Sequence, residues 1–187
     1  MQEELFEMLA GKAMGANTKR GKPYTWLVNH LQDSMDQVSP RSFFAALRAA
    51  AVETPADDLL PLNYRGIQVG VQQASQIRVK EIIEDYPWVK WVMEPLRGNL
   101  TVPCGILDIE KIWKDEQTVS QLEGRLSKQG DAVKLPPQNL DFGTSGILAD
   151  LESLGILERI DGKRIQMPDV YRVAFGFGRR GGVKPLK

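Results

Sequence analysis

Apolar residues recur every three or four positions along the N-terminal half of the chain. This spacing gathers them on one face of a helix and predicts a series of amphipathic helices. Ser39 and Pro40 indicate a helix start, because serine can cap free amides and proline needs no N–H at the first helical position. The predicted helices cover residues 3–14, 25–35, 39–52 and 66–85, with another short helix from Pro87. We therefore expect an N-terminal helical bundle.

The pattern changes near Cys104, after a crossover segment that contains Pro103. We place a domain boundary there, which gives an α-helical lid-like domain over residues 1–104 and a second domain over residues 105–187. In the second domain, Asp108 is suited to cap a helix. Residues 117–127 have helical spacing, and residues 130–139, with two adjacent prolines, are expected to form a loop.

The pattern is clearest in the last part of the chain. Residues 144–154 carry a helical apolar face, and Gly155 suits the left-handed conformation that ends a helix. Two short segments, 157–160 and 164–167, flank Asp161-Gly162, a dipeptide that favours a tight hairpin turn. Helix, strand, turn and strand follow in the order of a winged helix. The sequence therefore predicts a mainly α protein, with the helical bundle followed by a winged-helix-like α+β domain that contains a small β-hairpin.

Composition narrows the class of protein. Lysine plus arginine equals aspartate plus glutamate at 24 each, so no overall field points to a nucleic acid or a membrane. Cys104 is the only cysteine, which excludes an intrachain disulfide and favours a reducing compartment. The N-terminus lacks the basic start and apolar run of a signal peptide, and no stretch approaches the roughly 20 apolar residues of a membrane span. We expect a cytoplasmic protein with no membrane partner.

The sequence offers no complete catalytic or metal site. The segment from Gly15 to Pro23 superficially resembles a phosphate-binding loop, but its glycines are one residue too far apart and Pro23 replaces the required hydroxyl residue. His30 is the only histidine, so neither a zinc triad nor a serine–histidine pair has its usual partners. We therefore expect no enzymatic activity, no metal and no cofactor in this chain alone.

Arg41 is electrostatically unusual, because a cation in the first turn of a helix opposes the helix dipole. An anion at that position would remove the conflict, and arginine beside free helix amides can bind phosphate. The alternative is a surface residue paired with Asp33 or Asp36. From the residues alone, both interpretations stay open.

Basic residues gather at the C-terminal end, where Arg159 to Lys187 contains eight of them against two acids. The predicted nucleic-acid contacts are Lys163 and Arg164 on the hairpin and Arg179, Arg180 and Lys184 in the glycine-rich tail. The helix over 144–154 argues the other way, because it carries Asp150 and Glu152 without a lysine or arginine, and acids repel phosphates. DNA and protein therefore both remain open as targets, and Trp88 and Trp91 are the predicted contacts for a protein partner.

Three stretches together resemble the C-terminal region of large bacterial P-loop ATPases of the ParA-like and AAA/STAND type. They read RGKPYTWLVNHLQDSMDQVSPRSFFAALRAAA, YRGIQVGVQQASQIRVKEIIEDYPWV and LESLGILERIDGKRIQMPDVYRVAFGFGRRGGVKP. In such ATPases a helical lid follows the nucleotide core and begins with a proline–arginine motif that senses nucleotide phosphates. Val38-Ser39-Pro40-Arg41 looks like that motif, so the resemblance implies that Arg41 is a nucleotide-phosphate sensor when an ATPase core is present.

The chain departs from this family because it lacks the Walker A loop and the Walker B strand. The resemblance therefore implies a non-catalytic module that couples the nucleotide state of a P-loop ATPase core, in the same or a separate chain, to binding of a partner or of double-stranded DNA. ATP would enter only through that core. The alternative is a protein–protein interaction module that binds neither nucleotide nor nucleic acid.

Overall fold

A computed structural model describes residues 2–129 and 133–185. The protein is mainly helical with a few short strands, as predicted. The α-helices are α1 (Gln2–Ala10), α2 (Pro23–Leu31), α3 (Pro40–Glu53), α4 (Tyr64–Asp85), α5 (Pro87–Met93), α6 (Ile106–Asp115), α7 (Thr118–Gln129), α8 (Gly143–Ser153) and α9 (Asp169–Phe175). The shorter elements are the 3-10 helices η1 (Thr18–Arg20), η2 (Glu94–Leu96) and η4 (Leu140–Phe142), and strands β1 (Thr101–Val102), β2 (Cys104–Gly105), β3 (Glu158–Ile160), β4 (Arg164–Gln166) and β5 (Gly178–Arg179). Residues 130–132 of the predicted loop and Lys187 lie outside the described residues.

The helix ends follow local chemistry. Ser39 caps α3 as predicted, with its Oγ accepting the N–H of Ser42 at 3.5 Å. Asp108 does not occupy the capping position of α6, because the helix begins two residues earlier. Instead its carboxylate reaches back to accept the N–H of Gly105 at 3.0 Å, which satisfies a free amide at the start of α6.

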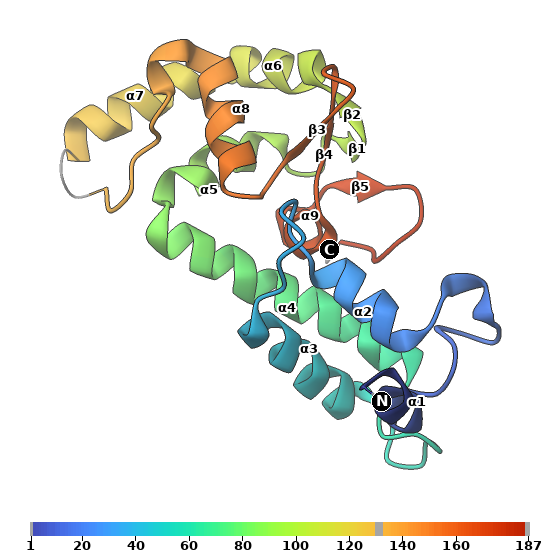
Figure 1. Ribbon diagram of the computed structural model, residues 1–187. Helices are drawn as coiled ribbons and strands as arrows, with labels where there is room; N and C mark the ends of the chain where they lie inside the picture. Colours follow the sequence, from blue (N-terminus) through green and yellow to red (C-terminus); the bar gives the residue numbers. More distant parts are fainter. Residues whose placement is uncertain (1, 130–132, 186–187) are drawn as a thin grey trace.

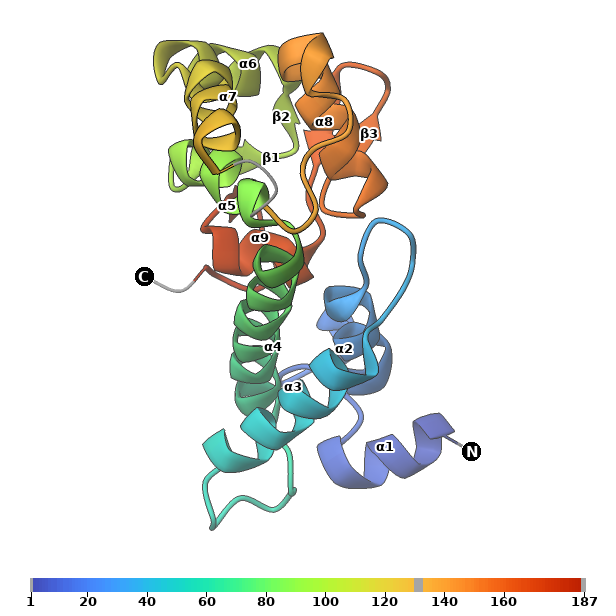
Figure 2. The same ribbon diagram turned by 90° about the vertical axis from the view of Figure 1, so that its left-hand side faces the viewer.

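Helix α4 runs along the long axis of the molecule, and α3 packs along its N-terminal part (Figures 1 and 2). Two glycines of α4 allow this close approach. A Cβ at Gly70 would lie 2.3 Å from the Ala46 carbonyl oxygen, and one at Gly66 would lie 2.5 Å from that of Ala50. Larger residues would force the two helices apart.

The helices α6, α7 and α8 lie around the other end of α4, beside the hairpin of β3 and β4 (Figure 2). The predicted hairpin is present, and Ile160 pairs with Arg164 across a turn in which Asp161 and Gly162 both have positive φ. This geometry matches the strand twist and explains the Asp-Gly dipeptide. Strand β2 adds to the other edge of β4, with Cys104 opposite Ile165, so the antiparallel sheet has the order β2-β4-β3.

Helix α9 and strand β5 were not predicted, and both connect the C-terminal end of the chain to earlier segments. Helix α9 packs on α4, where the N–H of Ala174 donates to the Ser75 Oγ at 3.0 Å. Strand β5 pairs in parallel with β1, with Gly178 opposite Thr101. Residues 168–185 are therefore part of the folded body.

Buried side chains from both halves of the chain belong to one hydrophobic core, which includes Leu27, Ile67, Trp88, Trp113 and Ile147. The predicted boundary between residues 104 and 105 falls at β2, next to this core. The division into two domains stays a prediction. Within residues 2–129 and 133–185, no helix has the length and apolar character needed to cross a membrane.

Candidate functional site

The hairpin carries the exposed basic residues that the sequence indicated. Lys163 lies in the turn and forms no ion pair within the described part of the chain. Arg164 begins β4, and its Nη2 lies 2.7 Å from the Asp161 Oδ2. The hydrogen bond from Arg164 lowers the pKa of Asp161. Because this pair is exposed to water, Arg164 can exchange its partner for another anion at little cost.

The two acids of helix α8 are not free at its surface, contrary to the prediction. Asp150 is 4% exposed, and its carboxylate accepts the N–H groups of Gln138 and Asn139 at 2.8 and 3.0 Å. It therefore fixes the preceding loop to the helix. Glu152 pairs with Arg159 of β3 at 2.8 Å. The predicted repulsion of phosphates by this helix is thus wrong for Asp150, which points inward, and is reduced for Glu152.

The outer side of α8 is small and uncharged. Its exposed residues Ser145, Ala149 and Ser153 are four positions apart and so lie along one line of the helix surface. Their short side chains leave the backbone of α8 accessible to a large partner.

The glycine-rich tail is folded around a buried arginine. Arg172 is fully buried, its Nε donates to the Asp169 Oδ1 at 2.6 Å, and its Nη1 donates to the Phe177 carbonyl at 2.9 Å. Its Nη2 donates to the Val183 carbonyl. Arg179 also contacts the Asp169 Oδ1, at 3.0 Å. The local excess of positive charge predicted from composition is therefore partly neutralised inside the fold.

Arg179 and Arg180 nevertheless lie together at the surface, where they help to form a pocket of about 590 Å³ beside the hairpin. Its other lining residues are Thr101, Val102, Pro103 and Gln166. The Gln166 Oε1 is buried and has no hydrogen-bond partner among the described residues. The pocket thus offers two cations, and an unbonded acceptor is buried in its wall. Thr101 and Gln166 carry no charge, and no pattern in the sequence indicated them.

Lys184 lies apart from this pocket. Its side chain is exposed, and its carbonyl accepts a hydrogen bond from the Gln72 Nε2 of α4 at 2.9 Å. The structure therefore groups Lys163 and Arg164 on the hairpin and Arg179 with Arg180 at its base, while Lys184 joins the tail to α4.

His30 contacts the same buried cluster. Its Nδ1 lies 2.7 Å from the Trp26 carbonyl, and its Nε2 lies 3.5 Å from the Asp169 Oδ2. Burial lowers the pKa of His30, and the Trp26 carbonyl and Asp169 carboxylate offset this only in part. Burial would raise the pKa of Asp169, but the hydrogen bond and charge of Arg172 outweigh it and lower that pKa. His30 and Asp169 therefore both have pKa values below their ordinary ranges within one buried cluster.

Arg41 is exposed at the start of α3 and pairs with Glu81 of α4 at 3.0 Å. The sequence alternative, a pair with Asp33 or Asp36, is not formed. The Asp33 carboxylate instead accepts the N–H groups of Met35 and Gln37, because the loop turns around it. Glu81 also lies 3.6 Å from Arg78, whose Nε donates to the Tyr171 hydroxyl of α9 at 3.1 Å. A chain of contacts therefore leads from Arg41 to α9.

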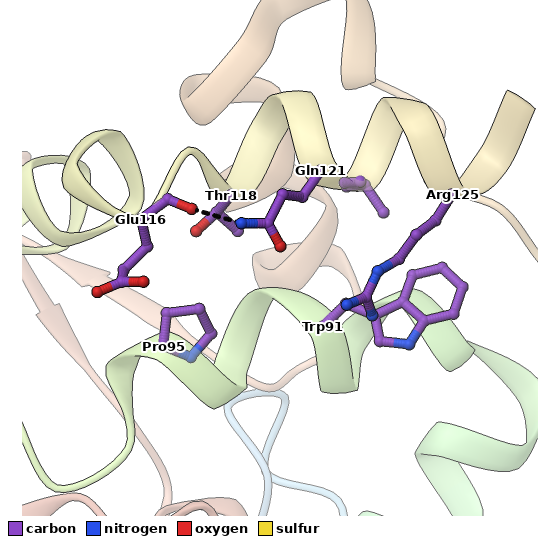
Figure 3. A pocket seen from close by; sticks show the side chains of 7 residues that line it. Trp91, Pro95, Glu116, Thr118, Gln121 and Arg125 are labelled. Atoms are coloured by element: carbon purple, nitrogen blue, oxygen red, sulfur yellow. Dashed lines mark hydrogen bonds between the residues drawn. The ribbon is translucent and has the colours of Figure 1, made fainter.

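The two predicted partner-binding tryptophans differ. Trp88 is 1% exposed and belongs to the hydrophobic core, so its prediction as a direct partner contact is wrong. Trp91 is half-buried and lies under the Arg125 guanidinium, 5.2 Å from the ring centre. Figure 3 shows Trp91 and Arg125 at one end of a surface pocket.

Comparison with protein-family models, with curated proteins and with solved structures finds no match. Among the described residues, no three histidine, cysteine, aspartate or glutamate side chains come together in a way that could hold a metal ion.

Proposed function

We propose that this chain is a DNA-binding accessory module of a P-loop ATPase and that it contacts duplex DNA through a winged helix. The observation that most supports this is the order β2, α6, α7, α8, β3 and β4, with β4 central in the antiparallel sheet and Lys163 at the hairpin turn. Winged helices use this arrangement to place one helix in the major groove and the hairpin against phosphates.

In this proposal, α8 enters the major groove with its exposed line of Ser145, Ala149 and Ser153. These residues are short enough for close approach and can bond or contact base edges. Lys163 and Arg164 contact the phosphates beside the groove. Arg180, together with Arg179, contacts a further phosphate at the base of the hairpin.

The coupling to ATP is the second part of the proposal and rests on the resemblance to the C-terminal region of bacterial P-loop ATPases. The chain itself is non-catalytic, and ATP is bound by a core in the same or a separate chain. Arg41 is exposed, and its ion-pair partner among the described residues is Glu81, so a phosphate group can compete for it. The contacts through Glu81 and Arg78 give such an exchange a route to Tyr171.

Fluorescence anisotropy with a labelled DNA duplex, measured over a range of salt concentrations, tests the DNA part. The variant that carries both Lys163→Gln and Arg180→Gln should bind more weakly, and the slope of log affinity against log salt should become shallower by about 2, one for each lost phosphate contact. The matched control carries Lys19→Gln and Arg20→Gln in η1, which makes the same change of charge away from the hairpin. Equal effects of the two variants would contradict the proposed interface.

The alternative is a winged helix that binds a protein. Two exposed apolar side chains favour it, Phe142 just before α8 and Leu107 on α6, which are 71% and 76% exposed. Changing Phe142 to serine should abolish capture of a partner ATPase if these residues form the interface, while DNA binding is unaffected. If the chain does not bind duplex DNA at low salt but captures the ATPase through Phe142, the protein-binding function replaces the DNA function.

A further inference from the structure

A second pocket lies between α5 and α7, and we call it the Trp91 pocket. Its outer part has a volume of about 450 Å³, and an adjoining recess has a volume of about 60 Å³. Trp91 and Pro95 lie on one side of it, and Thr118 and Gln121 face them from α7 (Figure 3). Leu122 also lines the recess. The Trp91 pocket includes none of the basic residues assigned to DNA, so a ligand bound here would be independent of the proposed function.

The charges of the Trp91 pocket are divided between its two ends. Figure 3 shows Arg125 above Trp91 at one end and Glu116 above Pro95 at the other. Lys90 beside Trp91 and Glu94 beside Pro95 also line the pocket. One end is therefore basic and the other acidic. Glu94 follows Lys90 by four positions, which corresponds to about 6 Å along a helix axis.

These four charged side chains have no ion-pair partners among the described residues, although charges of opposite sign lie in the same pocket. Each end can therefore accept a charge from a ligand. A ligand with a cation and an anion at matching separation would satisfy both ends at once.

Thr118 supplies a second observation that points to a ligand. It is 4% exposed, and its Oγ1 has no hydrogen-bond partner among the described residues. Leaving a buried hydroxyl unbonded destabilises a fold, so such a group calls for an explanation. Next to it, Gln121 uses its Nε2 on the Glu116 carbonyl at 2.9 Å, which leaves its Oε1 to accept from a ligand.

We propose that the Trp91 pocket binds a free dipeptide with an apolar side chain. An extended dipeptide spans about 7 Å, which is close to the axial spacing of Lys90 and Glu94. Its ammonium group lies at Glu94 and Glu116, and its carboxylate at Lys90 and Arg125. The apolar side chain contacts Pro95 and the edge of Trp91 that Arg125 leaves uncovered, and the peptide group bonds to the Thr118 Oγ1.

Calorimetric titration with alanyl-leucine tests this proposal. The dipeptide should bind, while N-acetyl-alanyl-leucine, which lacks the cation, and alanyl-leucine amide, which lacks the anion, should each bind about tenfold more weakly or worse, since each loses charged hydrogen bonds. No binding of alanyl-leucine at millimolar concentration, or equal binding of the acetylated form, would overturn the assignment.

Variants of the protein locate the site. Glu116→Gln should weaken binding of alanyl-leucine but not of its acetylated form. Arg125→Gln should weaken binding of alanyl-leucine and of its acetylated form but not of the amide, which has no carboxylate. Thr118→Val removes the hydroxyl at nearly constant shape and should weaken binding several-fold. Lys111→Gln on α6 lies outside the pocket and serves as the control. Circular dichroism verifies that each variant is folded, and binding that is unchanged in folded Thr118→Val or Glu116→Gln would show that the dipeptide does not lie in this pocket.

Discussion

At the scale of single residues, the buried cluster of His30, Asp169 and Arg172 joins three segments of the chain. His30 comes from α2, Asp169 and Arg172 from α9, and the arginine holds the carbonyls of Phe177 and Val183. Removing one partner from a buried ion pair leaves the other charge uncompensated, so these residues depend on one another. Arg172 is one of the basic residues counted between Arg159 and Lys187, and the sequence did not indicate that it is buried.

The state of His30 leads to a prediction about pH. Its pKa is lowered in the folded protein below the ordinary value of 6.5. Between these two values the unfolded chain binds a proton that the folded chain does not, so stability falls as the pH drops below about 6.5. Urea unfolding at about pH 7.5 and 5.5 should show a larger loss for the parent than for His30→Gln. Since His30 is the only histidine, an equal loss in both proteins would contradict this assignment.

At the scale of elements, the close packing of α3 on α4 depends on glycine. Gly70→Ala should destabilise the protein by about 3 kcal/mol, because its Cβ would lie 2.3 Å from the backbone oxygen of Ala46 and the helices must move apart. Gly124→Ala in α7 is the matched control. Nothing lies within 4 Å of a Cβ at Gly124, so alanine should stabilise the helix by about 0.5–1 kcal/mol. Denaturant unfolding measures both, and a similar effect at the two sites would disprove the packing argument.

The helices also differ in how far the sequence predicts them. Helices with one buried face, such as α3 and α4, were predicted within a few residues because their periodicity reports burial. Helix α9 was missed because Val170, Tyr171, Arg172 and Val173 are buried in succession, which erases the period. The strand β5 has two residues and exists only through pairing with β1.

The residues of the candidate sites also differ in whether the sequence alone could identify them. A charged residue next to an Asp-Gly turn can be recognised in a sequence, and Lys163 was found on that basis. Gln166 and Thr118 could not be found, since their relevance comes from an unbonded buried atom that depends on the tertiary fold. Trp88 was assigned to the surface because an aromatic residue beside a proline looks the same in a sequence whether it lies in a core or at an interface.

At the scale of the whole molecule, the two predicted domains share contacts that cross residue 104. Helix α9 lies against α4, Gly155 accepts the N–H of Ser34 at 3.1 Å, and β5 pairs with β1. Separating the halves would expose the core residues around Val79, Ile82 and Tyr171 and leave the Ser75 hydroxyl without the N–H of Ala174. Each of these losses opposes independent folding.

We therefore predict that the chain unfolds in one cooperative step. Hydrogen exchange of the intact protein at increasing denaturant concentrations is the direct measurement, because it reports the free energy of opening for each helix. Amides in the middle of α3 and of α8 should exchange through the same global opening, with equal free energies and equal dependence on denaturant. If α8 opens at lower free energy while α3 stays protected, the two domains are independent and the boundary near Cys104 is a true one. A shared opening means that a change at Arg41 and a change at the hairpin act on the same folded body, which the proposed coupling requires.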